Sequence, residues 1–413
     1  MNSKGSPKEA YVWLWLPGET EPVVAGRLAR ADDGVLVFNY GQSYLARSNA
    51  IPIYEPELPL RAGELPLLNG LQMPNCIRDA SPDAWGRRVL LYRAGARADN
   101  VAELDELTYL LESGSDRIGA LDFQSSPTEY VPRAGIHTPM HELMEAAQRI
   151  QDGLPVSQAL DLALRHGTSI GGARPKVTLE EAGKKYIAKF SSNKDLYNVV
   201  KAEFVAMRLA ALCSINTATV RLESVMDKDV LLVERFDRVR SGQGWARNAM
   251  ISALTILGLD EMMARYASYE DLADVIRQRF TAPRATLHEL FRRIVFNILC
   301  GNTDDHARNH AAFLDGSYLA LTPAYDLCPQ GRTGNEATQA MLIIGQNKYS
   351  KLSVCVQAAH KFQLEDAAAQ TIIDQMEHVI KDNWVEVCES AGLTQHEREL
   401  MLGRQFLNPF IFE

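Results

Sequence analysis

The sequence predicts an α+β protein with a strand-rich start, a mixed middle and a helical last part. Short runs rich in β-branched and aromatic residues, AYVWLWL, EPVVAGRLAR and GVLVFNYG, lie between turn-forming residues near the start. Strand-like and helical segments alternate from about residue 157. After about residue 245, apolar residues recur at helical spacing, as in ATLHELFRRIVFNILC. We therefore expect three parts, residues 1–130, 131–245 and 246–413.

The composition is that of a protein with a substantial buried core. Of the 413 residues, 46% are hydrophobic and 23% are charged. The net charge of −9 opposes broad nonspecific binding to nucleic acid or anionic membranes. The six cysteines form no C-x-x-C pair, which favours reduced thiols over a zinc cluster or a disulfide framework. No signal peptide and no membrane helix are expected, so the predicted location is the cytoplasm.

Local signals place several elements. In SPDAWGRRVLLYRAGA we expect a helix capped by Ser81, with Pro82 and Asp83 in its first turn. In ATLHELFRRIVFNILC, Thr286 and Glu289 are expected to form a capping box. Two hairpin strands are expected in TSIGGARPKVTLEEAGKKYIAKF, around the turn Glu-Glu-Ala-Gly. Further helices are expected in VAELDELTYLLES, MHELMEAAQRIQDG, SQALDLALRHG and YNVVKAEFVAMRLAALC, and further strands in TATVRLESV and DVLLVERFDRV.

The stretch GNTDDHARNH, residues 301–310, follows a buried helix and has three interpretations. His306 and His310 beside two aspartates are compatible with a metal site, but the stretch has neither the H-E-x-x-H order nor a cysteine. A solvated loop is the second interpretation. The third is a catalytic loop, because Asp304 and Asn309 have the D-x-x-x-x-N spacing of kinases, although the HRD prefix is missing.

Phosphoryl transfer requires a second carboxylate to hold magnesium against the phosphates. The segment YLALTPAYDLCP provides Asp326, seventeen residues after Asn309, at the end of a strand-like run. An aspartate in such a place is often only a turn residue. Its pairing with Asp304 and Asn309 favours the metal-binding interpretation.

Groups that would contact a nucleotide lie upstream. The stretch SIGGARPK offers backbone N–H groups and cations to phosphates, although it lacks the Walker A order. Lys189 in YIAKF matches the strand lysine of V-A-I-K, with Glu203 on the next helix as its candidate partner. Alternatively, the glycines form a simple turn and Glu203 is solvated. The backbone of Glu234, Arg235 and Phe236 in LLVERFDR is expected to contact the adenine edge.

Together these motifs resemble the HipA serine/threonine kinase toxins over nearly the whole chain. The resemblance rests on TSIGGARPK, IAKF, AEFVAMRLA, LLVERFDR, GNTDDHARNHAAFL and LTPAYDL in that order, and on SPDAWGRR and DRIGALDF near the start. It implies a two-lobed, protein-kinase-like fold and a type II toxin–antitoxin module. It also implies a HipB-like helix-turn-helix antitoxin, operator DNA contacted mainly through that antitoxin, and phosphorylation of a protein serine, typically on an aminoacyl-tRNA synthetase.

The resemblance also implies site roles. Asp304 is the expected catalytic base, Asn309 and Asp326 are expected to bind Mg²⁺, and Ser169 matches the autophosphorylated serine. Arg174-Pro175 stands where some family members have Gln-Glu, which bears on the mobility of the loop. The expected ATP contacts are Gly171, Gly172, Ala173, Arg174, Pro175, Lys176, Lys189, Glu234, Arg235, Phe236, His306, Asn309, Tyr325 and Asp326.

Two other functions remain open at this point. One is a small-molecule kinase similar to the aminoglycoside phosphotransferases, which share the Asp-x-x-x-x-Asn loop. The other is a catalytically silent binding module that supports a repressor complex. The presence of Asp304, Asn309, Asp326 and Lys189 argues against the silent module.

Overall fold

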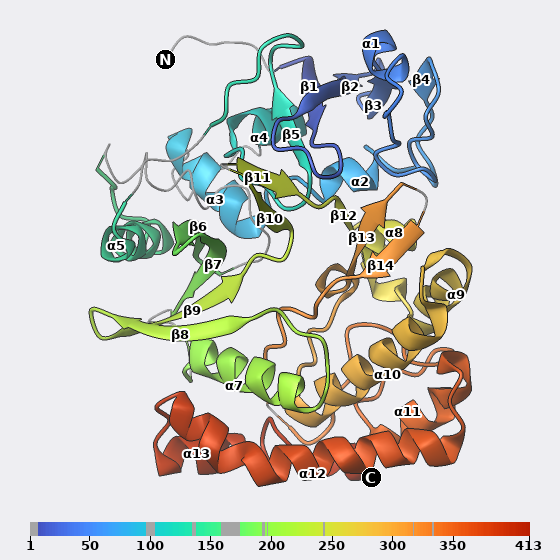
Figure 1. Ribbon diagram of the computed structural model, residues 1–413. Helices are drawn as coiled ribbons and strands as arrows, with labels where there is room; N and C mark the ends of the chain where they lie inside the picture. Colours follow the sequence, from blue (N-terminus) through green and yellow to red (C-terminus); the bar gives the residue numbers. More distant parts are fainter. Residues whose placement is uncertain are drawn as a thin grey trace. The chain divides into compact units, whose positions relative to one another are not determined.

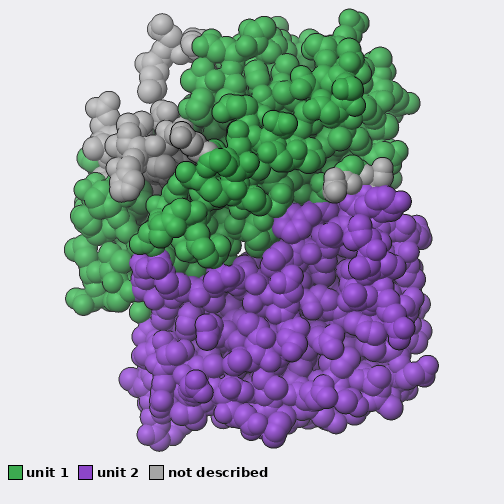
Figure 2. Space-filling view, in the orientation of Figure 1, with its two compact units in different colours: residues 1–192, 224–251, 314–316 green, residues 193–223, 252–313, 317–413 purple. Residues whose placement is uncertain are grey.

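A computed structural model of the chain describes residues 7–95, 104–133, 138–157, 174–191, 195, 197–242, 244–316, 318–332 and 334–413. The chain divides into two compact units, coloured separately in Figure 2. The first comprises residues 1–192, 224–251 and 314–316, and the second comprises residues 193–223, 252–313 and 317–413. Within the described ranges, no helix is both long and apolar enough to cross a membrane.

The first unit begins with an antiparallel sheet in the order β4-β3-β2-β1-β5 (Figure 1). The expected strands near the start of the chain are confirmed. β2 and β3 pack closely at Gly26, because a Cβ atom there would lie 2.1 Å from the Asn39 carbonyl oxygen. The strands are β1 (Glu9–Leu14), β2 (Val23–Arg30), β3 (Leu36–Tyr40), β4 (Glu64–Leu65) and β5 (Leu121–Gln124).

A second sheet, ordered β6-β7-β9-β8, follows in the chain. Ala182 and Gly183 have φ angles of +49° and +74°, which confirms a tight hairpin turn between β6 and β7. β10 and β11 form a further antiparallel pair. The strands are β6 (Lys176–Glu181), β7 (Lys184–Phe190), β8 (Val220–Val225), β9 (Lys228–Glu234), β10 (Arg238–Ser241) and β11 (Gly244–Arg247).

Helices α3 and α5 cover one face of this second sheet and bury its apolar side chains. On β7, Tyr186, Ala188 and Phe190 are buried in this core, whereas Lys189 belongs to the alternate set of residues. The core residues on α3 and α5 include Trp85, Val89, Leu143, Met144 and Ile150. The helices of this unit are α1 (Gln42–Leu45), α2 (Asn75–Arg78), α3 (Ala84–Arg93), α4 (Glu106–Glu112) and α5 (Met140–Gln151).

The N-terminal cap predicted for α3 is wrong. Asp83, not Ser81, is the N-cap residue, and its side chain accepts a hydrogen bond of 3.3 Å from the Gly86 backbone N–H. Pro82 therefore lies before the helix and not in its first turn. Ser and Asp are both strong N-cap residues, so their order in SPDA did not decide where the helix begins.

A buried network of ion pairs connects distant segments of the first unit. Asp116 accepts from Arg235 and Arg238, each at 3.0 Å, and both arginine side chains are only 1% exposed. Asp237 pairs with the same two arginines at 2.8 Å and accepts from the Gly119 N–H at 2.8 Å. Burial alone would raise the pKa of Asp237, but the arginines lower it to about 2. We call these residues, Asp116, Arg235, Asp237 and Arg238, the arginine–aspartate network.

The second unit is mainly helical, which confirms the expectation for the chain after residue 245. α12 packs against α7 and α10 (Figure 1). The α-helices described in the second unit are α7 (Val199–Leu212), α8 (Ala253–Ile256), α9 (Tyr269–Arg279), α10 (Pro283–Cys300), α11 (Leu352–Ala358), α12 (Asp366–Ser390) and α13 (Gln395–Met401). Short 3₁₀ helices span η2 (Ala264–Tyr266), η3 (Ala307–Asn309), η4 (Ala359–Phe362) and η5 (Pro409–Phe412). A small sheet has the order β12 (Met250–Ser252), β13 (Ala311–Asp315) and β14 (Tyr318–Leu321).

The capping box predicted in α10 is also wrong. The helix begins at Pro283, one turn earlier, because proline at the first helical position needs no N–H partner. The Thr286 hydroxyl donates to the Ala282 carbonyl at 2.8 Å, and Glu289 accepts from Arg293 at 3.0 Å. Both residues therefore lie inside the helix.

Candidate active site

The polar loop after α10 begins at a backbone position that requires glycine. Gly301 has φ +71°, and a Cβ atom there would lie 2.5 Å from the Gln405 carbonyl oxygen. The left-handed conformation ends the helix and turns the chain away from its axis. The loop residues that follow are thus fixed to the end of a buried helix.

Backbone hydrogen bonds fold this loop tightly and bring Asp304 and Asn309 together. The His306 N–H donates to the Asp304 carbonyl and the Asn309 N–H donates to the His306 carbonyl, both at 2.8 Å. The Asn309 side-chain Nδ2 also donates to the Asp304 carbonyl at 3.3 Å. Asn309 is 8% exposed, whereas the Asp304 side chain remains exposed. A polar, accessible carboxylate therefore lies beside a fixed amide.

The segment after β14 brings Asp326 to the same loop. Ala324 is held by a parallel bridge to Thr217, and the Tyr325 hydroxyl donates to the Arg308 carbonyl at 2.7 Å. Asp326 has φ +59°, a conformation that is uncommon for residues other than glycine and that aspartate tolerates better than most. Backbone strain of this kind concentrates at functional sites.

The neighbouring carboxylates affect the ionisation of Asp304. The pKa of Asp304 is raised, first by its partial removal from water and then by the negative charges of Asp326 and Asp305, although His306 lowers it. A raised pKa suits a carboxylate that must accept a proton near neutral pH. Clustered carboxylates also favour a bound cation.

Asn309 and Asp326 offer the oxygen donors that Mg²⁺ prefers. Because Asn309 Nδ2 donates to the Asp304 carbonyl, the amide oxygen of the same side chain is directed away from that carbonyl. No group of three His, Cys, Asp or Glu side chains in the described part of the chain forms a metal site by itself. Asn309 and Asp326 would thus hold a metal ion through their side-chain oxygens.

The structure gives Asp305 a place that the catalytic-loop interpretation did not assign to it. Asp305 is 1% exposed and accepts hydrogen bonds from Tyr269, Asn297 and His310. The only signal in the sequence is that the loop has one more acidic residue than a base requires. The donors come from residues 269 to 310, so spacing could not identify them.

In the first unit, Lys176 and Lys189 are direct neighbours across β6 and β7. Opposed residues of an antiparallel pair point to the same face, here the face opposite the apolar core formed with α3 and α5. Lys176 is 4% exposed, and the Trp85 indole donates to its backbone carbonyl at 3.1 Å. The two lysine side chains therefore leave the same face of the sheet, and cationic side chains suit phosphate oxygens.

The rest of the expected phosphate loop is described only in part. Arg174 is partly exposed, and buried Pro175 accepts a hydrogen bond of 3.2 Å from the Phe190 N–H. Ser169, Gly171, Gly172 and Ala173 lie outside the described residues. Their predicted roles stay predictions.

The segment expected to contact adenine, Glu234 to Phe236, lies at the end of β9. Some of its polar groups already form hydrogen bonds or ion pairs within the protein. The Arg235 N–H donates to the Lys185 carbonyl at 2.8 Å, and the Phe236 carbonyl accepts from Asn248 Nδ2 at 3.3 Å. Glu234 forms an ion pair with Lys184 at 2.8 Å. Adenine contacts of this segment would thus fall on groups other than the Arg235 N–H.

Glu203 lies on α7 of the second unit and is 3% exposed, so it is not a solvated helix glutamate. Its predicted partner Lys189 belongs to the first unit. The Lys189–Glu203 pair stays a prediction.

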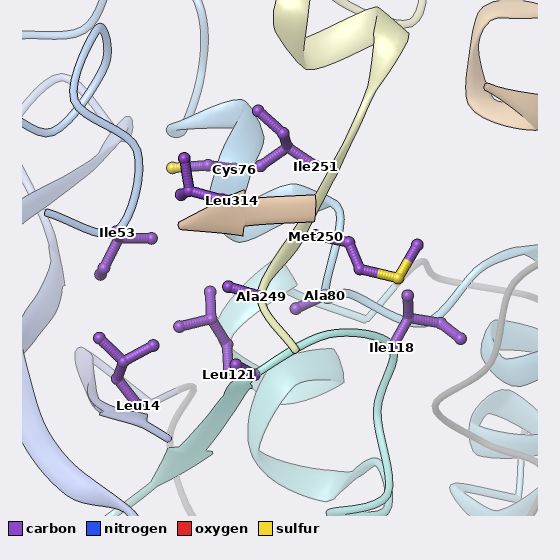
Figure 3. Close-up of a pocket in the computed structure, with 11 residues that line it drawn as sticks. Leu14, Ile53, Cys76, Ala80, Ile118, Leu121, Ala249, Met250, Ile251 and Leu314 are labelled. Carbon is purple, nitrogen blue, oxygen red and sulfur yellow. The ribbon is translucent and has the colours of Figure 1, made fainter. Parts of the chain in front are cut away.

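A pocket elsewhere in the first unit is unsuitable for a nucleotide (Figure 3). Its lining consists of apolar side chains and Cys76, whose thiol pKa is raised by burial. These side chains provide no cation and no strong hydrogen-bond donor for phosphates. The lining residues include Leu14, Ile53, Ile118, Leu121, Met250 and Leu314.

Comparisons with known proteins agree along most of the chain. A family model described as "HipA N-terminal domain" matches residues 19–124, and one described as "HipA-like C-terminal domain" matches residues 168–384. A Sinorhizobium fredii protein named as a kinase, Y4mE, is 25% identical over 340 residues, which are 76% of each chain. The serine/threonine-protein kinase toxin HipA of Shewanella oneidensis is 26% identical over 211 residues, 44% of this chain and 48% of that protein.

Among solved structures, a complex of Shewanella oneidensis HipA, HipB and operator DNA contains a chain of similar fold. The TM-score is 0.70 at 19% identity, and the match covers 97% of this chain and 99% of that chain. This likeness confirms the predicted α+β, kinase-like fold.

Proposed function

The chain belongs to the HipA family, and we propose that it is an ATP- and Mg²⁺-dependent serine/threonine protein kinase that acts as the toxin of a toxin–antitoxin module. The observation that best supports this activity is the convergence of Asp304, Asn309 and Asp326 on one loop of the second unit. A base and two oxygen ligands are the side chains that phosphoryl transfer requires in addition to phosphate-binding cations.

In the proposed reaction, Asp304 accepts the proton of a serine hydroxyl while the hydroxyl oxygen forms a bond to the γ-phosphorus of ATP. The bond from that phosphorus to the β–γ bridging oxygen breaks, and ADP leaves with the electron pair. Asn309 and Asp326 would hold Mg²⁺, which when bound would supply positive charge to the phosphate oxygens. Lys176 and Lys189, on neighbouring strands of the first unit, bind phosphate oxygens of ATP.

The direct test is transfer of radiolabelled phosphate from ATP in a cell lysate, with the labelled protein identified by mass spectrometry. We expect one predominant labelled protein, an aminoacyl-tRNA synthetase, with the label on serine. An Asp304→Asn variant is the control and should give no label. Label on a small molecule would favour the aminoglycoside-type alternative. ATP consumption no greater than in the Asp304→Asn control would favour the silent binding module.

We further propose that the partner is a small helix-turn-helix antitoxin that supplies most contacts to operator DNA. The Shewanella oneidensis complex, which contains HipA, HipB and operator DNA, supports this proposal. The net charge of −9 agrees with it, because binding to DNA phosphates requires cationic side chains. Tight, sequence-specific operator binding by this chain alone would contradict it.

A further inference from the structure

The buried carboxylate of Asp305 receives three side-chain hydrogen bonds on one oxygen. Asn297 Nδ2 donates to Asp305 Oδ2 at 2.7 Å, His310 Nε2 lies 2.8 Å from the same atom, and the Tyr269 hydroxyl also donates to it. Asp305 is 1% exposed, and each of its three partners is 2% exposed or less. Such a network is fully withdrawn from water, so its geometry is set by its own members.

These partners come from three rigid elements of the second unit. Tyr269 is the first residue of α9, Asn297 lies in the last turn of α10, and His310 immediately precedes β13. The Asn297 Oδ1 atom accepts from Asn302 Nδ2 at 2.9 Å, and the rings of Tyr269 and His310 meet edge to face with centroids 5.6 Å apart. Hydrogen bonds of Asp305 thus connect the loop to α9, to α10 and to the start of β13.

Asp305 and His310 each lie next in the chain to a proposed site residue. Asp305 follows Asp304, and His310 follows Asn309, so each functional residue is bonded covalently to a residue held in the buried network. The Asp305–His310 hydrogen bond therefore joins residues five positions apart, as the Asp304–Asn309 pair does, one position later in the chain. A change in that bond would change the distance between the base and the metal ligand.

We propose that Asp305 is a positioning residue that sets the separation and orientation of Asp304 and Asn309. This inference rests on the proposed phosphoryl-transfer function, because it gives Asp305 a role only through those two side chains. Asp305 does not itself face the reactants, since it is buried. Its effect should fall on the chemical step and on the metal dependence of the site, and not on nucleotide binding without metal.

The test compares Asp305→Asn with the unsubstituted chain and with Glu57→Gln. Glu57 is a matched control: it is a buried carboxylate in the first unit, 6% exposed, which accepts from the Cys76 N–H at 2.8 Å. For Asp305→Asn we expect kcat to fall roughly 10- to 100-fold, the usual effect of losing a residue that orients a metal ligand. The KM for ATP should stay within about threefold of the original value.

A second readout does not require turnover. Titration of a fluorescent ATP analogue should give unchanged affinity without Mg²⁺, and a higher Mg²⁺ concentration for half-maximal enhancement in Asp305→Asn. Tyr269→Phe removes only one donor and keeps the ring, so it should shift both readouts in the same direction by a smaller amount. Glu57→Gln should leave both readouts unchanged even if it lowers the melting temperature.

Several outcomes would overturn the inference. A folded Asp305→Asn protein with kcat within threefold of the original and an unchanged Mg²⁺ dependence would do so. A loss that merely follows the melting temperature, with Tyr269→Phe unchanged, would show that Asp305 only stabilises the fold. Failure of the proposed function would appear differently, as inactivity of the unsubstituted chain, and the Mg²⁺ titration would still decide the role of Asp305.

Discussion

Lys176 and Lys189 face each other directly across β6 and β7, with their side chains on the sheet face opposite the apolar core. Two cationic side chains on one face of a sheet can contact the same phosphate group. The pair is therefore a stronger indication of phosphate binding than either lysine alone. The sequence had placed Lys176 in a loop and Lys189 on a strand.

Lys189→Met should weaken ATP binding about 10- to 100-fold, which corresponds to the loss of one charged hydrogen bond of roughly 1.5–3 kcal/mol. Lys176→Met should act in the same direction. Lys184→Met is the matched control, because Lys184 lies on the same strand but pairs with Glu234 at the exposed surface. Calorimetric titration with Mg-ATP measures the three affinities. Equal affinities in all three variants would remove the lysine pair from the nucleotide site.

Asp304→Asn should reduce phosphoryl transfer by roughly 10²- to 10⁴-fold, the contribution usual for a general base. ATP affinity should remain close to that of the original chain, because the nucleotide is held by the lysines and the metal. Asp374→Asn, an exposed substitution on α12, serves as the control. Transfer within a few-fold of the original rate would exclude Asp304 as the base.

Asp326→Asn should abolish the Mg²⁺-dependent part of ATP binding. Asparagine is preferable to alanine here because it tolerates the left-handed backbone of Asp326, so the variant loses charge without added strain. ATP affinity measured with and without Mg²⁺ gives the result directly. An unchanged ratio of the two affinities would mean that Asp326 is only a turn residue.

Incubation with Mg-ATP should place a phosphate on Ser169, detectable by mass spectrometry of the peptide. The added charge of about −1.5 to −2 would repel ATP phosphates or pair with Arg174 or Lys176, so Ser169→Asp should weaken ATP binding. Ser169→Ala should bind ATP normally and accept no phosphate at this position. An unmodified Ser169 together with full affinity of Ser169→Asp would contradict the predicted inhibition.

Stability should fall in acid through Asp122. Burial would raise the pKa of Asp122, but Arg117 and Arg133 lower it to about 2, below the unfolded value of about 3.9. A depressed folded-state pKa gives stability that is present above the unfolded pKa and lost as pH falls toward 2, roughly 2 kcal/mol in total. Urea unfolding between pH 5 and pH 2 should show this loss. In Asp122→Asn the free energy of unfolding should start lower and depend less on pH.

The contrast between Asp304 and Asp305 shows how far the sequence could predict the site. Asp304 and Asn309 lie within one short loop, so their spacing nearly determined their proximity. Asp305 depends on donors from Tyr269 and Asn297, which are brought to it only by packing of α9 and α10. Tertiary contacts of this kind leave no periodic pattern in the sequence.

The predicted first residues of two helices were wrong for a different reason. The residues around Asp83 contain two good N-cap residues, and the choice between them depends on how the preceding chain enters the helix. In α10, the predicted capping box was compatible with local preferences, but Pro283 allowed an earlier start. Strands β1, β2 and β3 were predictable because their runs of β-branched and aromatic residues lie between turn-forming residues.

The arginine–aspartate network affects where the coding sequence can be truncated. Asp116 belongs to the segment that matches one family model, whereas Arg235, Asp237 and Arg238 belong to the segment that matches the other. A truncated product beginning after residue 130 would keep Arg235, Arg238 and Asp237 but lose the Asp116 carboxylate, which leaves two guanidinium groups for one carboxylate. An uncompensated buried charge typically costs about 3–5 kcal/mol. The boundary between the two matches is therefore a poor place to cut, and expression of the C-terminal part alone should give an insoluble or misfolded fragment.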